Sequence, residues 1–188
     1  AKRIIRHGDI VDTVADAIVF STNEHLFLSG GAGASLLGKH GKPLQEAMNR
    51  ALAASGSKIA HRGSVFEIEP AETWGRMFAV VAANGFYETS REDTTEALRL
   101  VLQRCSEIEG LKTVAITALG TGYGNMEIED FVELFCGTEI PEPLESVELV
   151  IPSEIFFREA CRMNESLGTL AEVSFQTHPT TRLTSEDA

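Results

Sequence analysis

Apolar residues along the chain follow two periodicities, and segments of the two kinds alternate. Short segments that are apolar throughout, or apolar at every second position, are typical of β-strands. Longer segments with an apolar residue every three or four positions are typical of helices. Strands are predicted at residues 2–6, 17–21, 64–69, 77–83, 113–118, 147–151 and 170–176. Helices are predicted from about Ala34 onward, between Pro43 and Gly56, between Ser90 and Gly110, and at residues 127–135 and 153–163. Strands and helices that alternate in this way predict the α/β class.

The chain is long enough for one domain with one sizeable core. It has 188 residues, of which 43% are hydrophobic, and this content is close to the average for globular domains. We expect a single domain over residues 1–176. We expect a polar C-terminal tail over residues 177–188, because the apolar periodicity ends there.

The charge balance limits the partners that the chain can have. Lys and Arg number 16 against 28 Asp and Glu, which gives a formal net charge of −12, and no basic run interrupts the excess. Binding to free nucleic acid or to an anionic membrane needs a basic face, so neither is expected. A small anionic ligand stays possible, because one pocket can differ from the average field.

The sequence lacks the patterns of a membrane span, a secretory signal, paired cysteines and a metal site. No segment approaches the ~20 consecutive apolar residues of a membrane-spanning helix, and we expect no secretory signal in the first residues. The three cysteines, at positions 105, 136 and 161, are odd in number and lack CxxC spacing. This favours structural thiols, and we expect a cytoplasmic protein. The histidines are scattered without metal-ligand spacing, so neither a metal nor a cofactor is expected.

Two glycine-rich segments differ from this scaffold, because each follows a predicted strand and precedes a predicted helix. The first contains Gly30, Gly31 and Gly33, and the second runs from Gly120 to Gly124. Glycine lets the backbone approach a ligand closely, and helix N-termini bind phosphate through unpaired N–H groups. In a mostly parallel sheet both segments would lie at the carboxyl edge of the strands, where they could hold a diphosphate from two sides. They could also be tight turns with no ligand.

Neither segment matches a common nucleotide motif. The second reads G-x-G-x-G rather than G-x-G-x-x-G, and the chain contains no G-x-x-x-x-G-K-[ST]. Hydride transfer with a dinucleotide and hydrolysis of a nucleoside triphosphate are therefore poorly supported.

The order of short motifs along the chain resembles the macrodomain family. The matching motifs, in chain order, are Gly8-Asp9-Ile10, residues 15–23 (ADAIVFSTN), Leu26 with Gly30-Gly31-Ala32, and residues 118–124 (ALGTGYG). The resemblance covers residues 2–164, most of the chain. It implies a three-layer α/β/α sandwich with a central mixed, mostly parallel sheet. It also implies a cleft that binds ADP-ribose or an ADP-ribosylated protein, without a cofactor.

Carried over position by position, the resemblance assigns ligand contacts to individual residues. Asp9 would accept a hydrogen bond from the adenine amino group beside the backbone of Ile10, and Asn23 would contact the distal ribose. The distal ribose and the pyrophosphate would lie along Ser29, Gly30, Gly31 and Ala32. The phosphates would be enclosed from the other side by Gly120, Thr121, Gly122, Tyr123 and Gly124.

The chain departs from the family pattern at positions that bear on catalysis. The usual N-A-A-N reads Phe20-Ser-Thr-Asn23, and the usual G-G-G-V reads Ser29-Gly-Gly-Ala32. Many hydrolytic members carry an acidic residue just after that valine, where this chain has Gly33. Binding of ADP-ribose or a related ADP-ribosyl group is the leading hypothesis. The alternative is a hydrolase for ADP-ribosyl-protein bonds, O-acetyl-ADP-ribose or ADP-ribose-1″-phosphate, with Asn23 as its catalytic residue. A third possibility is a scaffold domain without a ligand.

Overall fold

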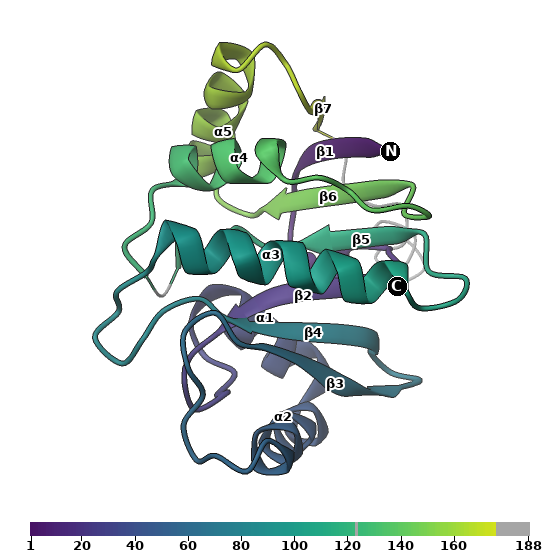
Figure 1. The fold of residues 1–188 in the computed structure, drawn as a ribbon, viewed down its shortest axis with the longest axis vertical. Helices are drawn as coiled ribbons and strands as arrows, with labels where there is room; N and C mark the ends of the chain where they lie inside the picture. The colour runs from purple at the N-terminus through teal and green to yellow at the C-terminus, as the bar shows by residue number, and fades with distance from the viewer. Residues whose placement is uncertain (123, 176–188) are drawn as a thin grey trace, which may run out of the picture.

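A single sheet of seven strands runs through the computed structural model, which describes residues 1–122 and 124–175. The strand order is β3-β4-β2-β5-β6-β1-β7 (Figure 1), and all neighbours are parallel except β3, which is antiparallel to β4. The strands are β1 (Lys2–His7), β2 (Ala17–Thr22), β3 (Val65–Ala71), β4 (Gly75–Val81), β5 (Thr113–Ile116), β6 (Ser146–Ile151) and β7 (Glu172–Ser174). The helices are α1 (Gly30–His40), α2 (Lys42–Ala54), α3 (Arg91–Ser106), α4 (Ile128–Gly137) and α5 (Glu154–Ser166), with a short 3-10 helix η1 (Ile10–Asp12).

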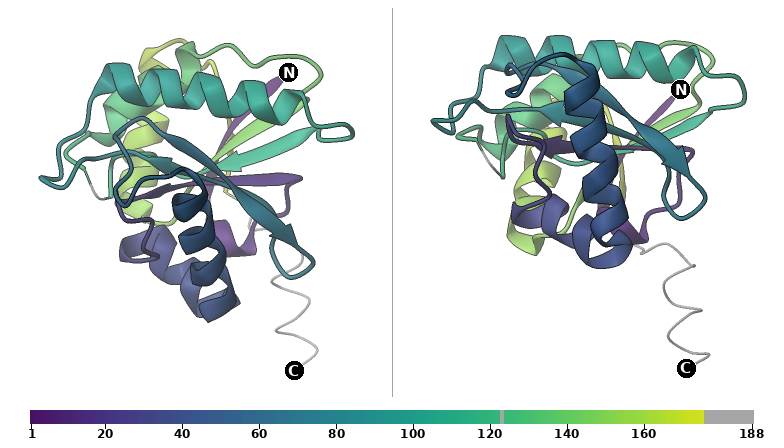
Figure 2. Two further views of the ribbon diagram at one scale, coloured as in Figure 1. Left: turned by 60° about the horizontal axis from the view of Figure 1, so that its bottom comes forward. Right: turned by 90° about the horizontal axis from the view of Figure 1, so that it is seen from below.

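Helices cover both faces of the sheet and make three layers. On one face α3, α4 and α5 contribute Leu98, Phe131 and Phe157 to the core. On the other face α1 and α2 contribute Leu36 and Met48, and Figure 2 shows α3 and the α1–α2 pair on opposite sides of the sheet. None of the helices in the described ranges is both long and apolar enough to cross a bilayer. The predicted three-layer α/β/α sandwich with a mixed, mostly parallel sheet is confirmed.

A row of buried residues crosses the centre of the sheet in register. Val19 of β2 lies opposite Ile116 of β5, Ile116 lies opposite Leu149 of β6, and Leu149 lies opposite Ile5 of β1. All four are fully buried. Because side chains alternate between the two faces, a slip of one residue in any of these strands would turn its apolar set away from its core. The core therefore fixes the register in which these four strands end.

Each predicted strand and helix is present, and most differ from the prediction only in their ends. One helix differs in a way that matters for the site. α1 begins at Gly30 and not near Ala34, so the first glycine-rich segment is the first turn of a helix and not a loop before it. Gly30 takes a φ of +71°, a conformation that glycine adopts at little cost. The low helix propensity of glycine conceals this start in the sequence.

The three cysteines lie on helices that pack against the sheet. Cys105 and Cys136 are buried, Cys161 is partly buried, and none of them forms a disulfide. Burial raises the pKa of the Cys105 thiol to about 12. A thiol in this environment stays protonated and behaves as a small apolar side chain, in agreement with a structural role.

A buried asparagine fixes the chain where it turns from α5 toward the edge strand β7. The side chain of Asn164 is fully buried. Its Nδ2 donates to the carbonyl oxygen of Ala171 at 2.9 Å, and its Oδ1 accepts from the N–H of Ala171 at 3.0 Å. One side chain thus pairs both backbone groups of a buried residue just before β7 begins.

Replacing Asn164 with Ala is expected to lower the free energy of unfolding by at least about 2 kcal/mol, since two buried backbone groups lose their partners at about 1–3 kcal/mol each. Chemical denaturation followed by circular dichroism measures this. Asn49→Ala is the matched control, because Asn49 is exposed on α2 and only accepts a hydrogen bond from Gln45. Equal stability of the two variants would contradict a stabilising role for Asn164.

Candidate functional site

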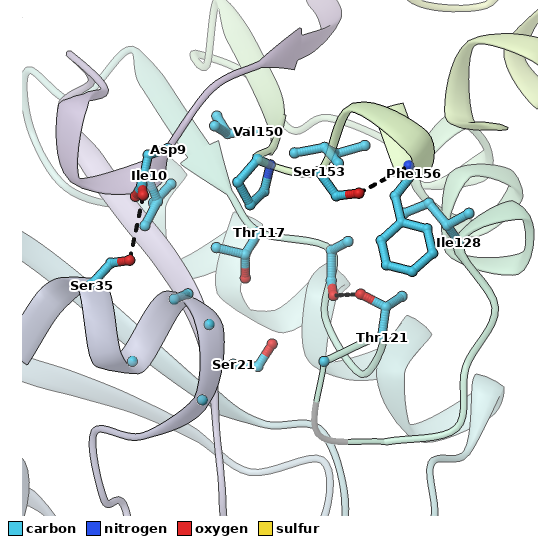
Figure 3. Close-up of a pocket in the computed structure, with 18 residues that line it drawn as sticks. Asp9, Ile10, Ser21, Ser35, Thr117, Thr121, Ile128, Val150, Ser153 and Phe156 are labelled. Carbon is cyan, nitrogen blue, oxygen red and sulfur yellow. Dashed lines mark hydrogen bonds between the residues drawn. The ribbon is translucent and has the colours of Figure 1, made fainter. Parts of the chain in front are cut away.

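A cavity of about 480 Å³ opens at the carboxyl edge of the sheet. Its walls come from the ends of β1, β6, β5 and β2, which are neighbours in the sheet, and from the starts of α1 and α5 (Figure 3). The volume is in the range of sites for small organic ligands. The position is the one at which open α/β sheets bind ligands, outside the carboxyl ends of parallel strands.

The first turn of α1 forms one wall of the cavity. Gly30, Gly31, Ala32 and Gly33 all line it. The N–H groups of a first turn have no partner within their helix. Here the side chain of Ser29 makes no capping hydrogen bond to them, and the turn contains no acidic residue. This wall therefore presents N–H donors and the positive end of a helix dipole, which suits an anionic group.

The backbone at Gly33 lies close to the loop that precedes the helix. A Cβ atom at Gly33 would lie 3.2 Å from the carbonyl carbon and 3.3 Å from the Cα of Leu28. Leu28 is buried, and its N–H donates to Oε1 of Gln45 on α2 at 2.7 Å, which holds the loop in place. A side chain at this position would therefore require the held backbone of Leu28 to shift slightly.

Asp9 lies at the end of β1 on another side of the cavity. Its Oδ1 accepts from the N–H of Val11 at 3.1 Å and caps η1, and its Oδ2 accepts from the hydroxyl of Ser35 at 3.4 Å (Figure 3). Ile10 is buried beside it and also lines the cavity. An ionised carboxylate can accept about four hydrogen bonds. Asp9 therefore keeps acceptor capacity for a ligand.

Apart from Asp9 and Ser35, the polar side chains around the cavity are the hydroxyls of Ser21, Thr117, Thr121 and Ser153. The Oγ1 of Thr117 is buried and has no hydrogen-bond partner. Among the described residues that line the cavity, Asp9 is the only one with a titratable side chain. Residues 1–122 and 124–175 contain no group of three or more His, Cys, Asp or Glu placed to hold a metal. The groups in this cavity that could donate to an anionic ligand are backbone N–H groups and hydroxyls.

The second glycine-rich segment faces the cavity with only part of its length. Thr121 and Gly122 line the cavity, whereas Gly120 and Gly124 do not. A Cβ at Gly124 would lie 1.9 Å from Cγ2 of Thr89, and a Cβ at Gly120 would lie 3.0 Å from the same atom. These two glycines therefore make room for the methyl group of Thr89.

The loop after β4 is joined to this segment by hydrogen bonds as well. The N–H and the hydroxyl of Thr89 both donate to Oδ1 of Asn125, at 3.1 and 2.6 Å. The cavity wall formed by Thr121 and Gly122 is thus supported from behind by a loop that does not itself line the cavity.

Asn23 does not line the cavity. Its amide holds the loop that follows β2. Its Oδ1 accepts from the N–H groups of His25 and Phe27, at 3.0 and 3.1 Å, and its Nδ2 donates to the carbonyl oxygen of Phe27 at 3.2 Å. A contact between Asn23 and a distal ribose stays a prediction. The other residues of the predicted site that do not line the cavity are Ser29, Gly120 and Gly124, and Tyr123 lies outside the described residues.

Several lining residues were not singled out by the motifs. Ile128, Val150 and Phe156 give the cavity an apolar wall, and Figure 3 shows Ile128 and Phe156 across the cavity from Asp9. Ser153 was identifiable as a helix N-cap, and its Oγ accepts from the N–H of Phe156 at 3.3 Å. Nothing in the local sequence signals that this helix start faces Asp9, because strand order decides it.

Comparisons with known proteins agree with this architecture. No protein-family model matches the chain, and neither does any curated protein. Solved structures match most of it. A variant of the Oceanobacillus iheyensis macrodomain with ADP-ribose superposes with a TM-score of 0.72 at 16% identity, covering 87% of this chain and 91% of the other.

Two further structures show the same likeness. The Oceanobacillus iheyensis macrodomain with MES bound gives a TM-score of 0.75 at 18% identity, covering 86% of this chain and 89% of the other. The Trypanosoma brucei macrodomain in complex with ADP-ribose gives 0.67 at 16% identity, covering 88% of this chain and 68% of the other. The chain therefore has the fold of the macrodomains, as the order of its sequence motifs predicts.

Proposed function

We propose that the chain binds ADP-ribose, or an ADP-ribosyl group with the same adenine and diphosphate parts, in the cavity at the carboxyl edge of the sheet. The observation that carries the proposal is that the first turn of α1 and the Thr121–Gly122 segment both line this cavity. Two backbone segments with few side-chain atoms can bring N–H donors to a diphosphate from two sides. Bound ADP-ribose in two of the structures with this fold supports the choice of ligand.

The remaining groups fit the adenine end of such a ligand. The carboxylate of Asp9 can accept a hydrogen bond from the exocyclic amine of adenine. The half-exposed ring of Phe156 and the side chains of Ile128 and Val150 supply apolar surface for a base. With adenine near Asp9 at the end of β1 and the diphosphate at α1, the distal ribose would extend toward the end of β2.

The same residues favour binding over hydrolysis. Gly33 has no side chain that could act on a scissile bond, and the amide of Asn23 is engaged within its own loop. Asp9 is bonded at the proposed adenine end and lies far along the ligand from a distal ribose. We therefore propose a binding function for the described site and assign no catalytic residue to it.

Adding a carboxylate to either glycine wall is expected to weaken binding of ADP-ribose at least about tenfold, because like charges brought together cost several kcal/mol. Gly31→Glu and Gly122→Glu are suitable changes, since nothing lies within 4 Å of a Cβ at either position and neither residue has a positive φ. The glutamate at position 31 also suits the first turn of a helix, so the fold should be retained. Isothermal titration calorimetry with ADP-ribose, AMP and ATP measures the affinities.

Gly38→Glu is the matched control for this experiment. Gly38 lies on the same helix, is equally open and lies outside the cavity. The control adds the same charge outside the cavity. It should therefore retain the affinity of the unmodified chain for ADP-ribose. Unchanged binding by both Gly31→Glu and Gly122→Glu would exclude this cavity as the diphosphate site.

Replacing Asp9 with Asn is expected to change which base is preferred. The unmodified chain should bind ADP-ribose at least about tenfold more tightly than its hypoxanthine analogue, because a carboxylate faces a carbonyl oxygen in the analogue and an amine in ADP-ribose. The amide of the variant can donate to that carbonyl, so the ratio of the two dissociation constants should fall toward one. Its Oδ1 can still cap η1. A ratio that stays the same in the variant would show that Asp9 does not contact the base.

A further inference from the structure

Large apolar side chains are exposed on three loops at one end of the sheet. Phe86 and Tyr87 follow β4 and are 83% and 65% exposed, Phe27 follows β2 and is 55% exposed, and Ile59 precedes β3 and is 48% exposed. The three loops lie at the carboxyl edge of β2 and β4, on the left of Figure 1, because β3 is antiparallel to β4 and begins at that edge. We name these four residues the loop patch.

The backbone beneath the aromatic residues of the patch is held by the same device in two loops. Asn84 accepts from the N–H groups of Phe86 and Glu88, at 2.9 and 3.0 Å, as Asn23 accepts from those two and four residues after it. In each loop the residue three after the asparagine has a positive φ, 56° at Leu26 and 61° at Tyr87. The aromatic rings therefore project from an ordered backbone, which lowers the entropy lost when they bind a partner.

Contacts between the loops join the patch into one surface. The N–H of Ala60 donates to the carbonyl oxygen of Glu24 at 2.8 Å. A Cβ at Gly85 would lie 2.5 Å from Oε1 of Glu24, so the loops after β2 and β4 touch. Exposed aromatic side chains on linked, ordered loops are typical of protein-binding surfaces.

The strand order places this surface next to the cavity. Along the carboxyl edge the strands follow one another as β1, β6, β5, β2 and β4. A ligand with adenine at the end of β1 and its distal ribose at the end of β2 points toward the loop after β4. That loop also supports the cavity wall, through Thr89 and Asn125.

We propose that the loop patch binds the polypeptide to which an ADP-ribosyl group is attached, a proposal that rests on the proposed function. The segment next to the modified residue leaves the cavity at the distal ribose and packs apolar side chains on Phe27, Phe86 and Tyr87. Charged residues of both signs lie beside the patch: Lys58 precedes Ile59, Glu88 follows Tyr87, and Arg62 donates to the carbonyl oxygen of Glu88 at 3.3 Å. Because neither sign of charge prevails there, apolar contact and not net charge selects the segment. The partner is thus an ADP-ribosylated segment with apolar residues beside the modified position.

Short synthetic peptides ADP-ribosylated on a central serine test this assignment. One peptide carries Leu and Phe beside the serine, and a second carries Gly at those positions. The apolar modified peptide is expected to bind about tenfold more tightly than free ADP-ribose, and the glycine peptide about as tightly as free ADP-ribose, because a few buried aromatic anchors account for such a difference. Isothermal titration calorimetry measures all three affinities.

Two variants remove rings from the patch without disturbing the loop. Phe86→Ser changes an exposed side chain, and Tyr87→Gly places glycine at a positive φ. Each is expected to lower the affinity for the apolar modified peptide about fivefold and to leave the affinity for free ADP-ribose unchanged. Leu100→Ser, on the exposed face of α3, is the control and should change neither.

The outcomes separate the two proposals. No binding of free ADP-ribose would overturn the proposed function. Binding of free ADP-ribose with no gain from the apolar peptide would overturn only the assignment of the patch. The assignment of the patch would also be overturned if the unmodified apolar peptide bound as tightly as the modified one. The same holds if analytical ultracentrifugation showed a dimer that Phe86→Ser converts to a monomer, since the patch would then bind another partner.

Discussion

The side-by-side parallel pairing of β1, β6, β5 and β2 is the constraint on which the rest of the structure depends. Four segments that lie far apart in the sequence reach the same edge because Ile5, Leu149, Ile116 and Val19 must share one buried row. The segments that follow these strands are thereby brought together: the capped turn of η1, the start of α5, the second glycine-rich segment and, after the loop of residues 23–29, the start of α1. The core of the sheet, and not any local motif, makes these groups neighbours.

The cavity proposed to bind a diphosphate has almost no charge of its own. The polar side chains among its described residues are hydroxyls and one carboxylate. The other donors are backbone N–H groups at the first turn of α1. Such groups are fixed in place by the helix, so a ligand does not have to order them. A net charge of −12 is compatible with this arrangement, because hydrogen bonds at short range are little affected by the average field.

The sequence was sufficient for the parts of the fold that periodicity encodes. Buried strands such as β5 (Thr113–Ile116) and amphipathic helices such as α3 (Arg91–Ser106) carry their pattern in their own residues. Contacts between residues far apart in the sequence were harder to predict. Gly120, Gly122 and Gly124 have the same spacing, yet only Gly122 faces the cavity, because Thr89 occupies the space beside the other two. That contact joins residues 31 or more positions apart, and no local pattern records it.

The other limit on prediction came from side chains that can either contact a ligand or stabilise their own loop. An asparagine after a strand can face a ligand or hold its own loop, and Asn23 takes the second use, as Asn84 does after the neighbouring strand. In the sequence, Ser21 and Thr117 are ordinary residues near the ends of two strands. Only the strand order of the sheet brings their hydroxyls to one cavity.

The close approach of Gly33 to Leu28 restricts how this site could change over evolutionary time. A Cβ at position 33 would meet the backbone of Leu28 and not the end of a flexible side chain, so that backbone would have to shift by a few tenths of an ångström to accept it. The backbone there is held by two side chains, since the N–H of Phe27 donates to Oδ1 of Asn23 and the N–H of Leu28 donates to Oε1 of Gln45. Acquiring an acidic side chain at position 33 would therefore cost stability unless the backbone held by Asn23 and Gln45 relaxes.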